Sequence, residues 1–397
     1  MRLFLNGLAA SAGGGLTYLR NVIPSLAARR DVQTTVAVSP ALRQEFGDLP
    51  RISFAPVKRS AGVVGRFWQE QTALPELLRS TRSDVLISAG NFALRKSPVP
   101  QILLSRNSLY TSPDFYRDLR SRGECRMWLD TRIRGMLAKR SLRWTDCTVA
   151  PSKAFADELH RWAGVEVIPI YHGFDRDLFF QDGLPLSLEV GRKLHATAHS
   201  LRLLFVSHYT YYRNFETLIR ALPALKQALA PRTVRLILTC DFSQTKGYCA
   251  DSAERLLRQL DLESEVVQLG PVPYRSLHHL YKACNVYVTP AYTETFAHPL
   301  VEAMASALPI VASHLAVHRE ICGSAAVYFS RFSPDELAQK VMEVVSSTEI
   351  WARLAENGKR RSENFSWSNH VDQIVALAVS LSGSRRDLRN LDDSVEK

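Results

Sequence analysis

The stretch at residues 292–313, YTETFAHPLVEAMASALPIVAS, decides the fold, because it carries the signals of a complete strand–helix–strand unit. It follows an apolar run at residues 285–289 that predicts a buried strand. Pro299 suits the first turn of a helix, where its missing N–H would be unpaired in any case. The run at residues 309–312 predicts the next strand. The stretch therefore indicates an α/β domain with a helix opening after a strand.

The same stretch predicts a binding site for an anion. The backbone amides of Phe296, Ala297 and His298 precede the helix and would point outward at the positive end of its dipole. Glu294 falls in the loop, and Glu302 lies one turn into the helix. An anion held by amides, with carboxylates beside it to accept hydroxyl hydrogen bonds, predicts a nucleotide-sugar site. The alternative is an ordinary strand–helix–strand unit whose acidic residues favour the helix start.

Apolar strands alternate with amphipathic helices along the whole chain, which predicts parallel sheets covered on both faces. In the first half we expect strands at residues 2–6, 32–38, 84–89, 101–106, 147–150 and 165–170. In the second half we expect them at residues 202–207, 234–239, 265–269, 285–289, 309–312 and 326–329. We therefore expect the α/β fold class, with two doubly wound, Rossmann-like domains facing each other across a cleft. Ligands of such sheets bind outside the carboxyl ends of the strands.

The length of 397 residues suits two domains of ordinary size. We expect the first domain at residues 1–180 and the second, the donor domain, at 201–365. Residues 181–200 are polar, contain Gly and Pro and lack a clear period, and they are interpreted as the linker. Residues 386–397 are expected to form a charged tail.

Composition narrows the class of partner and the compartment. The net charge of +11, from 50 basic and 39 acidic residues, favours anionic partners. The six cysteines are scattered without the spacing of metal ligands, as in a cytoplasmic protein with reduced thiols. No apolar run approaches the roughly 20 residues that span a bilayer, so no integral membrane segment is expected. No Asp-x-Asp pair ends a strand, so no metal is expected.

Residues 116–144 form a strongly basic segment with nine basic and three acidic residues. Tryptophan, methionine, leucine and isoleucine are interleaved at near-helical spacing. A basic amphipathic helix with this pattern predicts peripheral contact with an anionic membrane at its cytoplasmic face. The alternative is a surface helix that packs its apolar stripe on the sheet and solvates its charges.

The stretch from Glu294 onward resembles the donor-site signature of the retaining glycosyltransferases of family 4, which have the GT-B fold. The matching features are two Glu separated by seven residues, then Ala303-Met304-Ala305, then Pro309 before a hydrophobic strand. The departures are Thr295 and His298, where the family usually has Gly, and residues 307–308, Ala-Leu, in place of the Gly before Pro. The resemblance extends from residue 2 to about residue 380. It implies that a helix at about 366–385 returns to complete the first domain.

The resemblance also implies further donor-binding residues. Arg213-Asn214 resembles the Lys-Asn element of a family loop that reaches the donor diphosphate, and a guanidinium can hold two phosphate oxygens at once. Tyr212 replaces the second basic residue of that loop. A solvent-exposed Arg at a helix start is the alternative. Gly14 and Gly15 resemble the family's Gly-Gly loop, which faces the diphosphate from the other domain.

Arg106 and Asn107 end a strand where the family often has His or Asn facing the cleft. Arg106 is therefore a candidate contact for phosphate or acceptor, and a structural salt bridge is the alternative for this side chain.

The activity implied by the resemblance is transfer of a sugar from a nucleotide-diphosphate sugar to a hydroxyl acceptor, with retention of configuration. Glu302 would bind ribose hydroxyls, and Glu294 would be the catalytic residue beside the reacting carbon. The acceptor would be a carbohydrate or a lipid-linked glycan, and no cofactor is needed. A sugar-nucleotide epimerase or phosphorylase on the same fold is an alternative. A basic nucleic-acid-binding protein is another, but no recognised nucleic-acid motif supports it.

Overall fold

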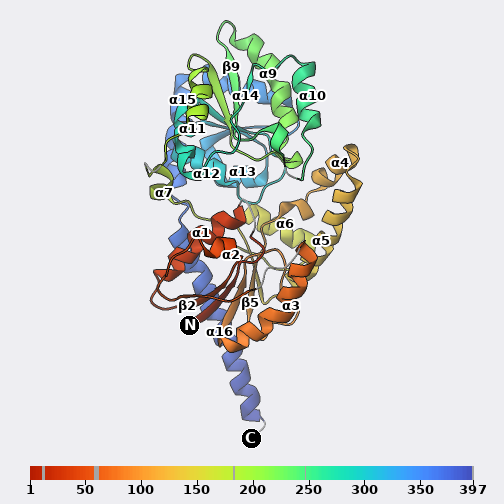
Figure 1. The fold of residues 1–397 in the computed structure, drawn as a ribbon, viewed down its shortest axis with the longest axis vertical. Helices are drawn as coiled ribbons and strands as arrows, with labels where there is room; N and C mark the ends of the chain where they lie inside the picture. Colours follow the sequence, from red (N-terminus) through yellow and green to blue (C-terminus); the bar gives the residue numbers. More distant parts are fainter. Residues whose placement is uncertain (11–13, 58–61, 182–183, 246, 396–397) are drawn as a thin grey trace. The chain divides into compact units, whose positions relative to one another are not determined.

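The computed structural model describes residues 1–397 except 11–13, 58–61, 182–183, 246 and 396–397. The chain forms two compact units, each with its own sheet (Figure 1). Unit 1 contains Met1–Thr111, Glu124–Gly173 and Ser366–Lys397, and unit 2 contains Ser112–Gly123 and Phe174–Phe365.

Unit 1 is built on a seven-stranded parallel sheet of order β3-β2-β1-β4-β5-β6-β7. Its strands are β1 (Arg2–Asn6), β2 (Gln33–Ala37), β3 (Ile52–Phe54), β4 (Val85–Ser88), β5 (Gln101–Leu104), β6 (Cys147–Ala150) and β7 (Ile168–Pro169). Its helices are α1 (Gly14–Ala27), α2 (Pro40–Arg43), α3 (Gly62–Ser80), α5 (Cys125–Trp144), α6 (Lys153–Ala163) and α16 (Trp367–Val395).

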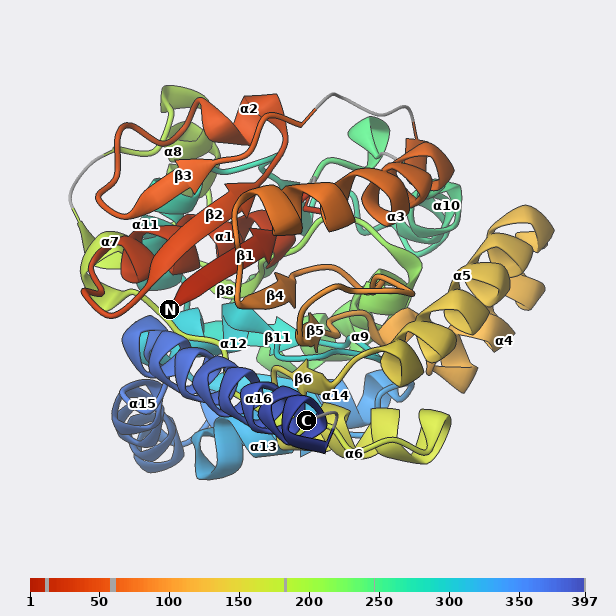
Figure 2. The same ribbon diagram turned by 90° about the horizontal axis from the view of Figure 1, so that it is seen from below.

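The alternation of side chains along β1 places apolar groups on both faces of this sheet. Leu3 and Leu5 belong to the hydrophobic cluster that includes α1 and α16. Phe4, between them, belongs to a second cluster with Leu74 and Leu78 of α3. Figure 2 shows α3 and α16 on opposite sides of the sheet. A strand buried on both faces explains why its sequence is a continuous apolar run.

The start of α16 packs directly on Gly173. A Cβ built on Gly173 would overlap the backbone of Ser366 and Trp367. Glycine is therefore required here by close approach of two backbone segments.

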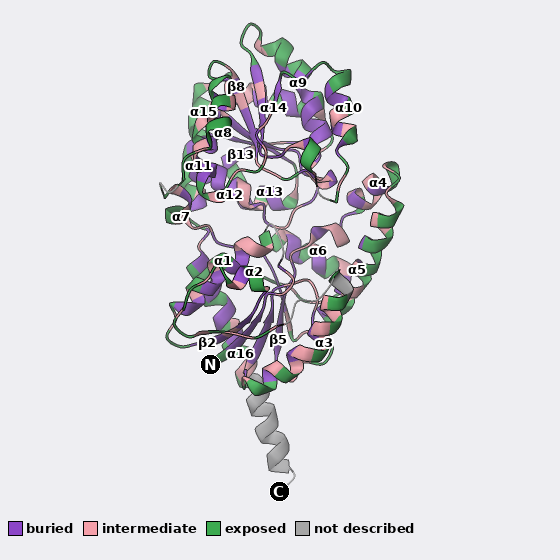
Figure 3. Cartoon of the chain, viewed as in Figure 1, coloured by how far each residue is buried: buried purple, intermediate pink, exposed green. Residues whose placement is uncertain are grey.

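Unit 2 is built on a six-stranded parallel sheet of order β10-β9-β8-β11-β12-β13. Its strands are β8 (Leu201–Phe205), β9 (Val234–Leu238), β10 (Val266–Gln268), β11 (Val286–Thr289), β12 (Ile310–Ser313) and β13 (Ala326–Phe329). Its helices are α4 (Pro113–Ser121), α7 (Arg176–Phe180), α8 (Leu188–His195), α9 (Phe215–Leu229), α10 (Asp251–Gln259), α11 (Leu277–Ala283), α12 (His298–Ala305), α13 (Ala316–Cys322), α14 (Pro334–Val345) and α15 (Thr348–Ser362). In both units the strands are mostly buried, and the helices carry the exposed surface (Figure 3).

The expected fold class is confirmed: both sheets are parallel, and every strand expected from the sequence is present. The strand β3 was not predicted, because it has three residues at the edge of the sheet and none of them is fully buried. The expected linker at 181–200 contains α8 and belongs to unit 2. Most of the expected charged tail at 386–397 is helical, since α16 continues to Val395. Residues 396–397 lie outside the described part of the chain.

The prediction of one basic helix over residues 116–144 is wrong. Gly123 has a φ of 73°, a left-handed conformation that ends helices, and it separates α4 in unit 2 from α5 in unit 1. The face that α5 buries consists mainly of small residues, while three of its large apolar side chains, Leu129, Ile133 and Met136, are exposed. The buried residues are Thr131, Gly135, Ala138, Ser141 and Leu142.

Within the described residues, no helix combines the length and the apolar character that a membrane span demands.

Candidate functional site

Two loops at the carboxyl edge of the unit 2 sheet carry most of the predicted site. One follows β8 and leads through a 3-10 turn, Tyr211–Arg213, into α9. The other follows β11 and leads into α12. Because β8 and β11 are parallel neighbours, both loops leave the sheet at the same edge.

Backbone and amide hydrogen bonds join the two loops. The Tyr292 N–H donates to the Tyr212 carbonyl at 3.0 Å. The Asn214 side-chain amide donates to the Pro290 carbonyl at 3.0 Å and to the Arg331 carbonyl at 2.7 Å. Asn214 has a φ of 57°, and Asn is one of the few residues that adopt this left-handed conformation readily. These hydrogen bonds therefore link the two loops to each other.

Arg213 and Glu294, both predicted from the sequence, form an ion pair across these loops. The side chains are 21% and 9% exposed, respectively. A partly buried guanidinium beside a partly buried carboxylate gives the site a positive group whose charge is balanced at close range. An incoming phosphate would compete with Glu294 for the same donor atoms.

Helix α12 begins at His298, with Pro299 in its first turn as expected. The residue at its N-cap is Ala297, which has no polar side-chain atom with which to cap the helix. The positive end of the helix dipole therefore lies beside Phe296, Ala297 and His298, the three residues predicted to hold an anion.

The backbone at Ala297 is left-handed, with a φ of 64°, and so is that at Ala307, with a φ of 55°. This conformation costs an alanine roughly 1–2 kcal/mol, whereas glycine adopts it freely. In this loop the backbone conformation that favours glycine is therefore found at Ala297. The resemblance to the family had placed a glycine at His298 instead. His298 is already helical.

Glu302 is 5% exposed and accepts a hydrogen bond of 2.7 Å from the Tyr281 hydroxyl. Burial raises the pKa of Glu302 to about 7, and the hydrogen bond from Tyr281 acts in the opposite direction. This carboxyl group changes charge near neutral pH, unlike an exposed glutamate.

His318, which the sequence did not single out, is completely buried in α13. Burial is the main reason that its pKa is lowered to about 4; the hydrogen bond with the Ser313 backbone acts in the opposite direction, and the charge of Arg213 adds to the lowering. The Nδ1 atom lies 2.9 Å from the Ser313 carbonyl, an acceptor, so Nδ1 carries the proton and Nε2 a lone pair. A single His in a short helix of mixed polarity, AVHREIC, gives no sequence signal for such a position.

Arg106 and Asn107 lie in unit 1. The Arg106 guanidinium lies 4.5 Å from the ring centroid of Tyr18 and donates to the Ala89 carbonyl, while its Nη1 atom is buried without a hydrogen-bond partner. Burial lowers the pKa of Arg106 from its usual value. No described carboxylate pairs with it, so the salt bridge considered for Arg106 is not formed. Asn107 accepts from the Leu109 N–H at 3.0 Å and caps a 3-10 turn.

Gly14 and Gly15 are the first residues of α1, in unit 1. A Cβ on Gly15 would lie 3.3 Å from that of Ala10, so the packing there is tight. A Cβ on Gly14 would meet no described atom within 4 Å. Residues 11–13, which include the first glycine of this run, lie outside the described residues.

Two family models match the chain, one to each half. The model described as Glycosyltransferase Family 4 matches residues 12–178, and the model described as Glycosyl transferases group 1 matches residues 192–361. The second match includes both loops of the site.

Curated relatives are similar over part of the chain. An uncharacterized glycosyltransferase of Methanocaldococcus jannaschii is 29% identical over 217 residues, covering 52% of each chain. The D-inositol 3-phosphate glycosyltransferase of Corynebacterium aurimucosum is 24% identical over 223 residues, covering 54% of this chain and 52% of the relative. The matches thus span about half the length of these relatives.

Solved structures show the same fold over nearly the whole chain. The sucrose-phosphate synthase of Thermosynechococcus elongatus has a TM-score of 0.75 at 19% identity, covering 96% of this chain and 99% of that one. HepE of Anabaena, in complex with UDP-glucose, has a TM-score of 0.71 at 18% identity, covering 96% and 100%.

Proposed function

Since the chain belongs to the group 1 glycosyl transferases and has their GT-B fold, we propose that it transfers a sugar from a nucleotide-diphosphate donor to a hydroxyl acceptor with retention of configuration. The observation that carries the proposal is the Arg213–Glu294 ion pair next to the start of α12. It places a cation, a helix dipole and a carboxylate within the joined loops of one unit.

The chemistry follows from where charge develops. When the bond to the sugar breaks, negative charge grows on the leaving diphosphate. Arg213 and the amides around Phe296–His298 are positive groups already held in place, so they would stabilise that charge with little reorganisation. No metal is part of the proposed reaction, in which these groups would take up the developing charge. Glu294, released from Arg213 by the phosphate, would face the donor sugar.

Glu302 is the candidate partner of the ribose hydroxyls, as the family resemblance implies. Its carboxylate already accepts from Tyr281, and a carboxylate has further lone pairs to accept from a second donor. The Gly14–Gly15 segment and Arg106 are candidates for contacts from unit 1. HepE was crystallised with UDP-glucose, so uridine nucleotides are the first donors to try.

A panel of UDP-, GDP-, ADP- and dTDP-sugars, screened by thermal shift, tests the proposal. We expect one nucleotide class to stabilise the wild type and the Arg220→Ala control, an exposed change on α9. The same ligand should stabilise Arg213→Ala much less. NMR of the transfer product then checks the retained configuration. If no sugar nucleotide stabilises the wild type and no transfer is detected, the proposal is wrong.

We also propose that α5 contacts an anionic membrane that carries the acceptor. Leu129, Ile133 and Met136 are 54%, 53% and 55% exposed, and their spacing of four and three residues places them on one stripe. Arg126 and Arg132 are exposed on the same helix. Apolar side chains flanked by cations suit the interface of anionic lipids.

Vesicle flotation tests this contact, with phosphatidylglycerol vesicles compared with phosphatidylcholine vesicles. Wild type should float only with the anionic vesicles, and Ile133→Glu should reduce that fraction. Leu188→Glu is the matched control, because Leu188 is 86% exposed but lies on α8 in unit 2. Equal flotation of the two variants would rule out α5 as the contact.

A further inference from the structure

The segment Ser112–Gly123 packs in unit 2, although the residues on both sides of it in the sequence belong to unit 1. It consists mainly of α4, and the chain leaves it through the left-handed residue Gly123. A short helix supplied by the first half of the chain is therefore part of the unit that holds Arg213 and Glu294.

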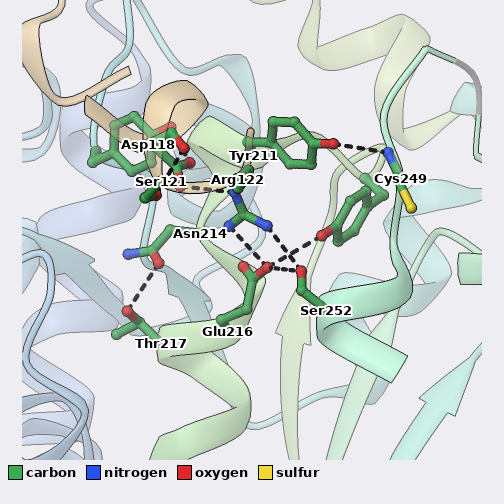
Figure 4. Close-up of polar contacts among 11 residues, drawn as sticks. Asp118, Ser121, Arg122, Tyr211, Asn214, Glu216, Thr217, Cys249 and Ser252 are labelled. Carbon is green, nitrogen blue, oxygen red and sulfur yellow. Dashed lines mark hydrogen bonds and ion pairs between the residues drawn. The ribbon is translucent and has the colours of Figure 1, made fainter. Parts of the chain in front are cut away.

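Arg122 at the end of α4 is held by polar and aromatic contacts (Figure 4). Its Nε atom donates to Asp118 at 2.7 Å, and its Nη1 atom donates to the Ser252 hydroxyl at 2.8 Å. Its Nη2 atom pairs with Glu216 at 2.9 Å, and the guanidinium lies 4.3 Å from the ring centroid of Tyr211. Contacts to all three guanidinium nitrogens fix the orientation of the group.

Glu216 is the buried partner in this network. Its side chain is 8% exposed and also accepts from the Ser252 hydroxyl at 2.7 Å and from the Tyr209 hydroxyl at 3.2 Å. Burial raises the pKa of Glu216, but the charge of Arg122 and the hydrogen bonds outweigh it, so the net pKa is below the usual value. Removing Arg122 would leave a buried carboxylate without its counter-ion, which is costly.

The same helix touches both loops of the candidate site. The Tyr292 hydroxyl donates to the second oxygen of Asp118 at 2.7 Å. Phe115 packs edge-on against Tyr212, with ring centroids 6.2 Å apart. Tyr212 is the neighbour of Arg213, and Tyr292 lies two residues before Glu294.

We propose that Arg122 is a positioning residue of the donor site: through Asp118 and Glu216 it holds in register the two loops that carry Arg213 and Glu294. Arg122 touches neither the ion pair nor α12 through any contact described above, so it acts only through the loops. The consequence for donor binding rests on the proposed function, whereas the effect on the loops does not.

Hydrogen exchange on the full chain tests the loop effect, comparing Arg122→Met with Arg117→Met. Arg117 lies on the same helix and is 75% exposed, so it matches the change in charge and size. We expect faster exchange at residues 206–216 and 290–299 in Arg122→Met alone. Tyr292→Phe, which removes one hydroxyl and leaves the Arg122–Glu216 pair intact, covers the case in which Arg122→Met does not fold. Tyr292→Phe should speed hydrogen exchange at residues 290–299.

The affinity for UDP, GDP and ADP is then measured by calorimetry. For whichever nucleotide the wild type binds, Arg122→Met should raise Kd roughly tenfold or more, because a small displacement of binding groups is costly. The Kd of Arg122→Lys should lie between that of the wild type and that of Arg122→Met. Unchanged exchange in both loops overturns the proposal, as does an unchanged Kd with loosened loops. Loosened loops in a protein that binds no nucleotide would support the holding role of Arg122 and contradict the proposed function instead.

Discussion

Glu294 neutralises Arg213 across two loops that leave neighbouring strands of unit 2. Two residues identified separately in the sequence, 81 positions apart, are thus direct partners. In the proposed reaction, this pair must open for the guanidinium to receive a phosphate. The carboxylate therefore opposes donor binding electrostatically, even if it assists the sugar.

Replacing Glu294 by Gln should separate these two effects. Without the negative charge, Arg213 interacts with a diphosphate unopposed, so we expect the Kd for a nucleoside diphosphate to fall several-fold. Transfer should fall by two orders of magnitude or more if Glu294 acts at the reacting carbon, since general acid–base or electrostatic groups contribute about that much. Calorimetry and a transfer assay measure the two quantities. Weaker nucleotide binding in Glu294→Gln would contradict the competition.

Replacing Glu302 by Gln should change the pH dependence of stability. The pKa of about 7 in the folded protein lies above that of an unfolded glutamate, so the folded state binds this proton more tightly. The stability from Glu302 is complete at acidic pH and is lost as pH rises through about 7. The variant should lose less stability between pH 5 and 8, by a difference on the order of 3 kcal/mol. Urea unfolding across this range measures the difference. Burial also raises the pKa of Glu70 to about 7. Because Glu70 is present in both proteins, its contribution to the pH dependence cancels in the comparison.

Replacing Ala297 by Gly should relieve a left-handed backbone at the start of α12. The gain in the folded state is offset by the greater freedom of glycine in the unfolded chain, which leaves a net stabilisation of up to about 1 kcal/mol. Ala303→Gly, in the middle of the same helix, should instead destabilise by about 1 kcal/mol. Chemical denaturation compares the two. Equal losses in both variants would show that the strain at Ala297 is absent.

Replacing Gly173 by Ala should destabilise unit 1, because the added methyl group overlaps backbone atoms at the start of α16. Overpacking of this kind costs roughly 1–3 kcal/mol. Gly191→Ala is the control, as a Cβ there meets nothing within 4 Å. A thermal melt with separate probes for each unit should show the loss in unit 1. Full stability of Gly173→Ala would mean that α16 can shift to accept the methyl group.

The sheets could be predicted because their strands are buried on both faces and therefore read as continuous apolar runs. Residues 85–88 and 286–289 are examples, and each is fully buried. The Glu294 loop and Arg213 could be found because a strand end, a helix-starting proline and charged residues are all local signals. The ion pair between them depends on the tertiary structure, and the sequence of neither loop alone predicts it.

The placement of α4 could not be predicted for the same reason. Asp118 and Arg122 look like ordinary members of an exposed basic helix, since i,i+4 pairs are common on helix surfaces. Their decisive partners are distant in the sequence: Tyr292 lies 174 residues from Asp118. Gly123 was visible, but a glycine within a helical pattern does not say that the following helix belongs to another unit. The left-handed backbone at Ala297 could not be predicted, because alanine in a sequence gives no signal for that conformation.

The path of the chain through α4 also limits how the protein can be divided. A fragment made of residues 174–365 contains the whole second sheet, yet it lacks the helix that supplies the cation facing Glu216. Such a fragment would expose the ring of Tyr212 and leave the hydroxyl of Tyr292 without its acceptor. Unit 2 is therefore not a module that can be excised or exchanged at one boundary. A chimera that exchanges this half would have to carry residues 112–123 with it.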